Sequence, residues 1–203
     1  MNKEIIIFDF DGVVVDSLQL GYSIKKKMMP DLKYSEWTSW FEGNLYKNIR
    51  KEHANKKSQN EFHKQYAADI IKHSPIHGMP DTLKKLSTRY DLIIVSSSVS
   101  QGIRSFLVKH KIKFLFKEIL GADVHQSKIE KFKIILNRYS IKPEETLIVT
   151  DSVGDIKEAK SVGIKSIAVT WGVHSRKKLA PSHPDFIATK PAEIIIGISR
   201  VLV

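Results

Sequence analysis

Two aspartates one residue apart, Asp9 and Asp11, follow an apolar run near the start of the chain and precede Gly12. Because side chains alternate along a strand, both carboxylates are expected on the same side, and the glycine lets the backbone turn sharply beside a ligand. Two acids so close repel unless a cation lies between them. Their oxygens suit Mg²⁺, which binds one or two protein carboxylates together with water and phosphate oxygens. A solvated acidic turn is the alternative, but the buried strand expected before this pair favours a metal site.

A second apolar run ends in three serines, Ser96, Ser97 and Ser98, just before a helix expected from residue 100. Hydroxyls and free backbone N–H groups at the end of a strand and the start of a helix form an anion site. Taken alone, such serines favour helix capping. Beside the acidic end of the first strand, Ser96 and Ser97 become candidates for binding a phosphate.

Two lysines lie in the first turns of a helix whose start is marked by Ser127 and Glu130, which have the spacing of a capping box. At 100° per residue, Lys128 lies nearer than Lys131 to the centre of the apolar face. Lys128 is therefore the better candidate to reach a phosphate. Lys131 is the reserve candidate, and a surface position is expected for it.

A third apolar run is followed by Asp151 and, four residues later, by Asp155. Asp155 is expected in the first turn of a helix, where the helix dipole favours an acid whatever the function. No such structural reason explains an acid at position 151. With Asp9 and Asp11, Asp151 would complete an oxygen-rich nest for a hard cation.

Five apolar runs are expected to form the strands that position these side chains, with helical patterns between them. Since strands alternate with helices, the sequence predicts an α/β fold with a doubly wound, Rossmann-like parallel sheet. Such sheets bind ligands at the carboxyl ends of their strands. The expected strands are residues 4–8, 91–95, 118–120, 146–150 and 165–170, and the expected helices are residues 80–89, 100–109, 128–139 and 155–162.

The segment between the first two strands has no strand pattern and is expected to form successive amphipathic helices. We therefore expect residues 17–77 to be a small all-α cap domain, inserted into an α/β core of residues 1–16 and 78–203. The insert has ten Lys and one Arg against six acids, so it carries nearly half of the excess positive charge. This surface could face an anion, although a solvated helical bundle would have the same composition.

The composition excludes several classes of protein. None of the 203 residues is a cysteine, which excludes disulfides, zinc–thiolate sites and cysteine nucleophiles. No apolar stretch resembles a membrane span or a signal peptide, so a soluble, cytoplasmic protein without a membrane partner is expected. The net charge of +11 comes mostly from scattered lysines, so nucleic acid is not expected as a partner. No feature indicates an oligomeric state.

The four motifs, in this order, resemble those of the haloacid dehalogenase superfamily in its phosphatase branch, over nearly the whole chain. The resemblance implies a Mg²⁺-dependent phosphatase that hydrolyses a small phosphate monoester through an aspartyl-phosphate intermediate. By position, Asp9 matches the nucleophile, and Asp11 matches the general acid and base, whose backbone carbonyl also binds the metal. The other implied roles are phosphate binding for Gly12, Ser96, Ser97 and Lys128, and metal binding for Asp151 with Asp155 as its companion.

The insert resembles the helical cap of phosphoglycolate phosphatases and β-phosphoglucomutases, and residues 171–175 and 184–187 are similar to the closing segment of the phosphoglycolate-phosphatase-like group. There are two departures. Lys128 is followed by Ile129 where proline is frequent, and Glu42 stands where the mutases carry a lysine. Glu42 therefore speaks against a mutase-type phosphotransferase. Asp11 speaks against dehalogenation, which needs no second acid.

The expected partner is a small phosphorylated metabolite such as phosphoglycolate, a sugar phosphate or a nucleotide-like monoester. A non-enzymatic binding protein on this scaffold is the last alternative, and the presence of all three motif aspartates speaks against it. Four residues of the insert are candidates for contacting the leaving group, although each could equally be a surface residue: Asn44, Tyr46, Lys47 and Arg50.

Overall fold

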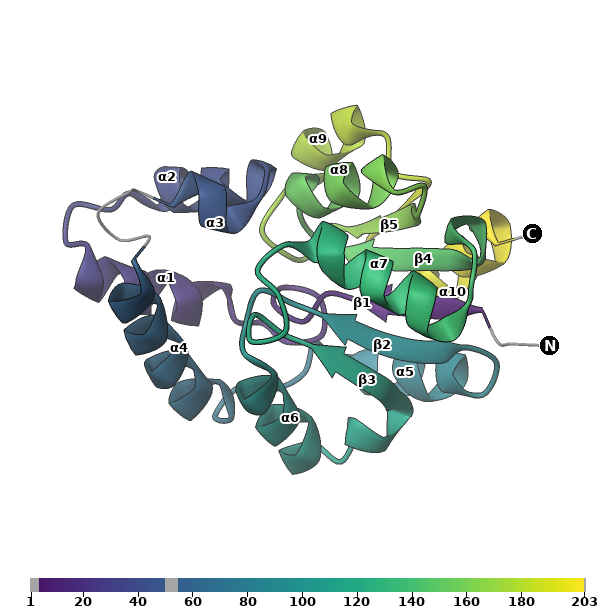
Figure 1. Cartoon of the computed structure of the whole chain (residues 1–203), viewed down its shortest axis with the longest axis horizontal. Coiled ribbons are helices and arrows are strands. Elements are labelled where there is room, and N and C mark those ends of the chain that lie inside the picture. Colours follow the sequence, from purple (N-terminus) through teal and green to yellow (C-terminus); the bar gives the residue numbers. More distant parts are fainter. Residues whose placement is uncertain (1–3, 50–54, 203) are drawn as a thin grey trace.

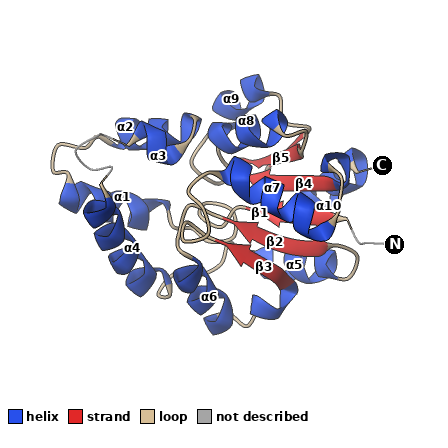
Figure 2. Ribbon diagram, viewed as in Figure 1, coloured by secondary structure: helices blue, strands red, loops and turns tan. Residues whose placement is uncertain are grey.

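The computed structural model describes residues 4–49 and 55–202. These residues form a sheet of six parallel strands in the order β3-β2-β1-β4-β5-β6 (Figures 1 and 2). The strand order reverses between β1 and β4, so the carboxyl ends of these two strands border the crevice where such sheets bind ligands. The strands are β1 Ile5–Phe8, β2 Asp91–Val95, β3 Phe116–Leu120, β4 Thr146–Thr150, β5 Lys165–Val169 and β6 Phe186–Ala188.

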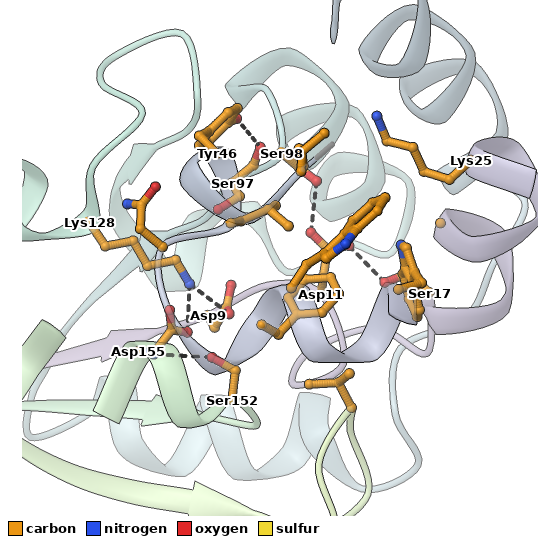
Figure 3. Close-up of a pocket in the computed structure, with 18 of the residues that line it drawn as sticks. Asp9, Asp11, Ser17, Lys25, Tyr46, Ser97, Ser98, Lys128, Ser152 and Asp155 are labelled. Atoms are coloured by element: carbon orange, nitrogen blue, oxygen red, sulfur yellow. Dashed lines mark hydrogen bonds and ion pairs between the residues drawn. The ribbon is translucent and has the colours of Figure 1, made fainter. Parts of the chain in front are cut away.

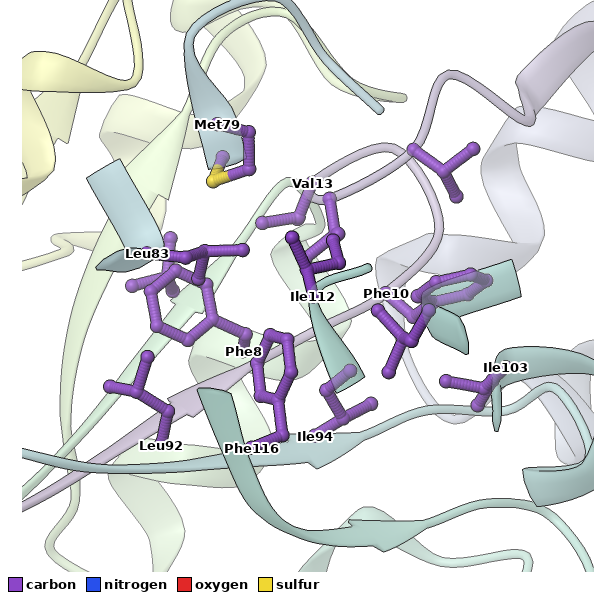
Figure 4. Close-up of a cluster of buried hydrophobic side chains, with 14 of the residues drawn as sticks. Phe8, Phe10, Val13, Met79, Leu83, Leu92, Ile94, Ile103, Ile112 and Phe116 are labelled. Atoms are coloured by element: carbon purple, nitrogen blue, oxygen red, sulfur yellow. The ribbon is translucent and has the colours of Figure 1, made fainter. Parts of the chain in front are cut away.

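Helices cover both faces of the sheet, and alternation along β1 supplies both cores. Ile6 and Phe8 enter the core that is shared with α5, α6 and α10 (Figure 4), whereas Ile5 and Ile7 enter the core that is closed by α7 and α8. Burial on both faces is what a continuous apolar run predicts for a central parallel strand. These helices are α5 Met79–Ser87, α6 Ser100–Lys109, α7 Lys128–Tyr139, α8 Val153–Ser161 and α10 Ala192–Val201, and the short α9 is Arg176–Leu179.

The segment between β1 and β2 is helical, and none of its described residues lies in a strand. Its helices lie beyond the carboxyl ends of the strands (Figure 1), and α1 packs against α4. A separate apolar cluster that includes Trp37 and Trp40 stabilises the segment. The helices are α1 Leu18–Met28, α2 Tyr34–Ser39, α3 Leu45–Asn48 and α4 Lys56–Ile70.

The predicted fold class, an α/β parallel sheet with a helical insert, is confirmed, and α6 and α7 have the predicted bounds. Helix α8 begins two residues earlier than expected because the hydroxyl of Ser152 accepts the N–H of Asp155 and caps it. The sequence did not predict β6 or α10. Strand β6 has only three residues, and α10 carries a run of isoleucines that periodicity does not assign to a helix.

No helix in the described ranges combines the length and the apolar character that crossing a bilayer requires.

Candidate active site

Asp9 and Asp11 leave the sheet directly after β1, at its carboxyl edge (Figure 3). The backbone N–H of Asp9 donates to the carbonyl of Val149 in β4 at 2.9 Å, which extends the strand pairing as far as the first aspartate. The chain then turns at Gly12, whose φ is +70° and whose N–H donates to the carbonyl of Val15 at 2.9 Å. Both carboxylates line one cavity at the crevice.

One ammonium group joins the first acidic motif to the last. Nζ of Lys128, in the first turn of α7, lies 2.7 Å from Oδ2 of Asp9 and 2.7 Å from Oδ2 of Asp155 (Figure 3). All three side chains are buried. Burial opposes the ammonium charge, but Asp155 and Asp9 outweigh it and raise the pKa of Lys128. Lys128 is therefore a permanent cation in this site.

Three buried carboxylates share this cation. Burial raises the pKa of Asp9 well above its usual value, and the charges of Asp155 and Asp151 add to the effect. Burial also raises the pKa of Asp151 to about 7, with Asp155 contributing. Burial acts in the same direction on Asp155, but Lys128 and hydrogen bonds, including one from the Thr150 hydroxyl at 2.6 Å, lower its pKa. Three carboxylates against one ammonium would leave two negative charges uncompensated.

The loop after β5 holds Asp151. The N–H of Val173 donates to Oδ2 of Asp151 at 2.7 Å, and the N–H of His174 donates to its backbone carbonyl at 3.3 Å. Gly12 and Gly172 lie so close to the Asp151 side chain that a Cβ atom at either position would overlap it. The two glycines therefore leave the space that the carboxylate occupies.

This donor set fits a hard divalent cation. Carboxylate oxygens of Asp9 and Asp151 lie at the same sheet edge, and burial raises the pKa of both groups, so a cation beside them would stabilise their charged forms. Within residues 4–49 and 55–202, no group of three or more His, Cys, Asp or Glu side chains could hold a metal ion by itself. Mg²⁺ does not need one, because water and phosphate oxygens complete its coordination around one or two carboxylates.

Four hydroxyls of the described residues donate to the carboxylate of Asp11. Its Oδ1 accepts from Ser17 at 2.7 Å and from Tyr66 of α4. Its Oδ2 accepts from Ser98 at 2.7 Å and from Ser96 at 3.3 Å. Residues from three separate segments of the chain therefore fix the orientation of this side chain.

Sequence reasoning missed three of these donors, namely Ser17, Tyr66 and Ser98. Ser98 had a usable signal, since it lies two residues after Ser96 at the same strand end. Ser17 lies six residues after Asp11 in the same connection. Tyr66 had no signal, because only the packing of α4 brings it to a residue 55 positions away.

The three residues predicted to bind phosphate beside Lys128 have different environments. Ser96 is fully buried and outside the cavity lining, with its Oγ accepting the N–H of Ser98 at 3.0 Å. Ser97 lines the cavity. The N–H of Gly12 is engaged with Val15, so this glycine makes the turn and gives space to Asp151.

The expectation that Lys131 is a surface residue is wrong. Lys131 is fully buried, and its Nζ donates to the carbonyl of Ser96 at 2.6 Å and to that of Gly121 at 3.4 Å. Burial, with a contribution from Lys128, lowers the pKa of Lys131 to about 7. The first turn of α7 lies against the loops after β2 and β3, so both of its lysines are covered, and Lys131 joins those two loops.

The helical insert forms the wall of the cavity that faces the sheet edge. Contacts that join this wall to the sheet domain include the following: Asn44 Nδ2 donates to Glu158 Oε1 at 3.0 Å, Tyr46 Oη donates to the Ser97 carbonyl at 2.9 Å, and Glu42 pairs with Lys178 at 2.8 Å.

The four candidates for contacting a leaving group thus have different positions. Asn44 and Tyr46 line the cavity but are bonded to the sheet domain, whereas Lys47 is exposed and outside the cavity lining. Arg50 lies outside the described residues.

The chain is similar to known proteins in sequence and in fold. The chain is 25% identical to a phosphoglycolate phosphatase from Synechococcus elongatus, over 97% of this chain and 98% of that protein. Its fold is similar to that of a haloacid dehalogenase-like hydrolase from Streptococcus pneumoniae, with a TM-score of 0.80, 23% identity and coverage of 96% and 97%. It is also similar to a predicted phosphatase from Clostridium acetobutylicum, with a TM-score of 0.83, 20% identity and coverage of 98% and 100%.

Residues 6–169 match the sequence profile described as haloacid dehalogenase-like hydrolase. This match includes all four motifs and most of the sheet. The predicted resemblance is therefore confirmed, and the chain belongs to the haloacid dehalogenase-like hydrolase family.

Proposed function

We propose that this protein is a Mg²⁺-dependent phosphatase that hydrolyses a small phosphate monoester through an aspartyl-phosphate intermediate. The observation that carries the proposal is the pairing of Asp9 with Lys128 in a cavity that also contains Asp11. This arrangement supplies a carboxylate nucleophile, a cation for the phosphoryl oxygens and a second acid for proton transfer.

In the first step, a carboxylate oxygen of Asp9 attacks phosphorus. The new P–O bond forms as the bond to the ester oxygen breaks, and Asp11 donates a proton to the departing alkoxide. In the second step, Asp11 removes a proton from water, which attacks the aspartyl-phosphate and releases phosphate and the free carboxylate. Lys128 compensates negative charge on the transferring group, which is the main requirement of phosphoryl transfer.

We assign metal binding to Asp9, the backbone carbonyl of Asp11 and Asp151, with Asp155 beside them. A bound Mg²⁺ would supply positive charge that shields the phosphate from the nucleophile. The hydrogen bond from Val173 to Asp151 keeps that carboxylate oriented.

We further propose that residues 17–77 act as a cap domain over a core of residues 1–16 and 78–203. The contacts of Asn44, Tyr46 and Glu42 with the sheet domain support this role, since they would close the cavity against bulk water during the reaction. The mutase alternative has less support, because Glu42 is an acid that pairs with Lys178 rather than a cation that faces the cavity.

Phosphate release from a panel of monoesters tests the proposal. Purified protein with Mg²⁺ should release phosphate, and EDTA should abolish the release until Mg²⁺ is restored. Asp9→Asn should lower kcat by at least about 10³-fold, because an amide is not a nucleophile at phosphorus. The matched control is Asp81→Asn, which changes an exposed aspartate on α5. If the wild type releases no phosphate from any ester, the proposed function is wrong.

A further inference from the structure

A lysine of the insert is buried against the cavity with no carboxylate partner in the described part of the chain. Lys25, on α1, is 5% exposed and lines the cavity, and its side chain extends from the helix toward it (Figure 3). Its Nζ lies 4.5 Å from the centre of the Phe62 ring. No carboxylate among the described residues pairs with Lys25, and burial lowers its pKa to about 8. A buried ammonium without a partner is unfavourable, so a ligand that supplies negative charge would stabilise it.

A second polar group near Lys25 also lacks a partner among the residues that the structure describes. Nδ1 of His63, on α4, is buried and has no hydrogen-bond partner within residues 4–49 and 55–202, and His63 lines the same cavity. Burial lowers the pKa of His63, and the nearby charge of Lys25 lowers it further. Buried polar atoms in proteins are almost always hydrogen-bonded, so an unpaired one at a cavity wall points to a ligand.

The other cationic side chain of the described cavity lining is already neutralised. Lys128 pairs with Asp9 and Asp155, so Lys25 provides the uncompensated positive charge. The cavity lining also includes Trp37 and Trp40, which offer apolar surface and no negative charge. The cavity therefore has an acidic region at the sheet edge, where a bound cation would be needed to balance a phosphate, and a positively charged position on the insert.

We propose that Lys25 and His63 form a second anion subsite, which binds a negatively charged group on the leaving group of the substrate. The substrate class is thus a phosphate ester or anhydride with a second anionic group, either a carboxylate or a second phosphoryl group. This inference rests on the proposed phosphatase function. Lys25 supplies the charge, Phe62 holds its ammonium, and Nδ1 of His63 donates the hydrogen bond that it lacks.

Pairs of substrates with and without a second anionic group distinguish the contribution of the subsite from that of the reaction centre. We would measure kcat/KM for two pairs of substrates. The first pair is 2-phosphoglycolate and the analogue in which an uncharged amide replaces its carboxylate, and the second pair is pyrophosphate and methyl phosphate. In at least one pair, the wild type should prefer the member that has the second anionic group. The pair that shows this preference identifies the second group as a carboxylate or a phosphoryl group. Lys25→Met should reduce this preference by at least about 10-fold, whereas Lys25→Arg should retain most of it.

Two further variants serve as controls. Lys27→Met removes the same charge from an exposed position on α1 and should leave the preference unchanged. His63→Leu should reduce the preference, and His63→Asn, which can place an amide N–H near the position of Nδ1, should restore part of it. Thermal unfolding confirms that each variant is folded.

Three results would overturn the inference while leaving the phosphatase proposal intact. The wild type could hydrolyse substrates with and without the second anionic group equally well. Lys25→Met could lower kcat/KM for both members of a pair by the same factor, which would indicate a purely structural role. Lys27→Met could reduce the preference as much as Lys25→Met, which would indicate a general charge effect. Absence of any phosphate release would instead reject the phosphatase proposal, and the subsite with it.

Discussion

The phenol of Tyr66 donates a hydrogen bond to Oδ1 of Asp11, which joins helix α4 of the insert to the loop after β1. The second oxygen of the same carboxylate accepts hydrogen bonds from the loop after β2. The acid that we assign to proton transfer is therefore oriented by the insert and by the sheet together. Packing of the insert over the sheet would place Asp11 for reaction as well as exclude water.

Tyr66→Phe tests this relationship. The variant should lower kcat by about 3-fold to 30-fold for alkyl phosphates, because Asp11 loses one hydrogen bond to a charged group while three hydroxyls remain. The effect should be smaller for p-nitrophenyl phosphate, whose leaving group needs little protonation. Tyr22→Phe is the matched control, since its hydroxyl donates to the Leu32 carbonyl within the insert. An equal loss with both substrates would contradict the proposed role.

Lys128→Met should damage both stability and catalysis. Asp9 and Asp155 would remain buried without their shared cation, which typically costs about 3–5 kcal/mol of unfolding free energy. The loss of charge at the phosphoryl group should lower kcat by at least about 10²-fold. Urea unfolding and phosphate-release assays measure the two effects. Lys133→Met, which breaks an exposed pair with Glu130 on the same helix, should cost less than about 1 kcal/mol and leave kcat unchanged.

Gly12 and Gly163 both have a positive φ, so alanine substitutions at the two positions distinguish the effect of backbone strain from an effect on the active site. Gly12 has φ +70° and Gly163 has φ +77°, so alanine at either position should destabilise the protein by about 1–2 kcal/mol. Only at Gly12 would the new Cβ overlap the carboxylate of Asp151, since at Gly163 it would meet Pro143 at 3.3 Å. Gly12→Ala should therefore also lower kcat and weaken Mg²⁺ activation. Full activity in Gly12→Ala would show that Asp151 does not need its present position.

Lys131 should make stability depend on pH. Its pKa is about 7 in the folded protein against 10.5 for an unperturbed lysine. Between these values the unfolded chain binds more protons, so stability should rise with pH from about 7 upward by at most about 1.4 kcal/mol per pH unit.

Denaturant unfolding of the wild type and Lys131→Met at several pH values measures this slope. The variant should lose the part of the slope that Lys131 contributes. Lys133→Met is again the control, because its exposed ammonium should not affect the slope. A wild-type slope that persists in Lys131→Met would refute the assignment to this residue.

The sequence by itself determined the sheet and the order of the motifs. Long apolar runs are buried on both faces of a parallel sheet, and the polar residues that end such runs must gather at one edge. This local logic was sufficient to bring Asp9, Asp11 and Asp151 to one sheet edge, and helical periodicity selected Lys128 as the lysine beside them. It was insufficient for β6, since a three-residue edge strand has too few side chains for a recognisable pattern.

Only the tertiary structure decided which side chains complete the site. Tyr66 reaches Asp11 because α4 packs against α1 and α6, and Lys131 is buried because two loops close over the start of α7. Lys25 and His63 looked like ordinary polar residues of a basic helical segment. The fold places both against the cavity, where, among the described residues, Lys25 has no carboxylate partner and Nδ1 of His63 has no hydrogen-bond partner. Helical periodicity describes one helix face at a time, whereas burial and pairing depend on the surfaces that other segments bring to that face.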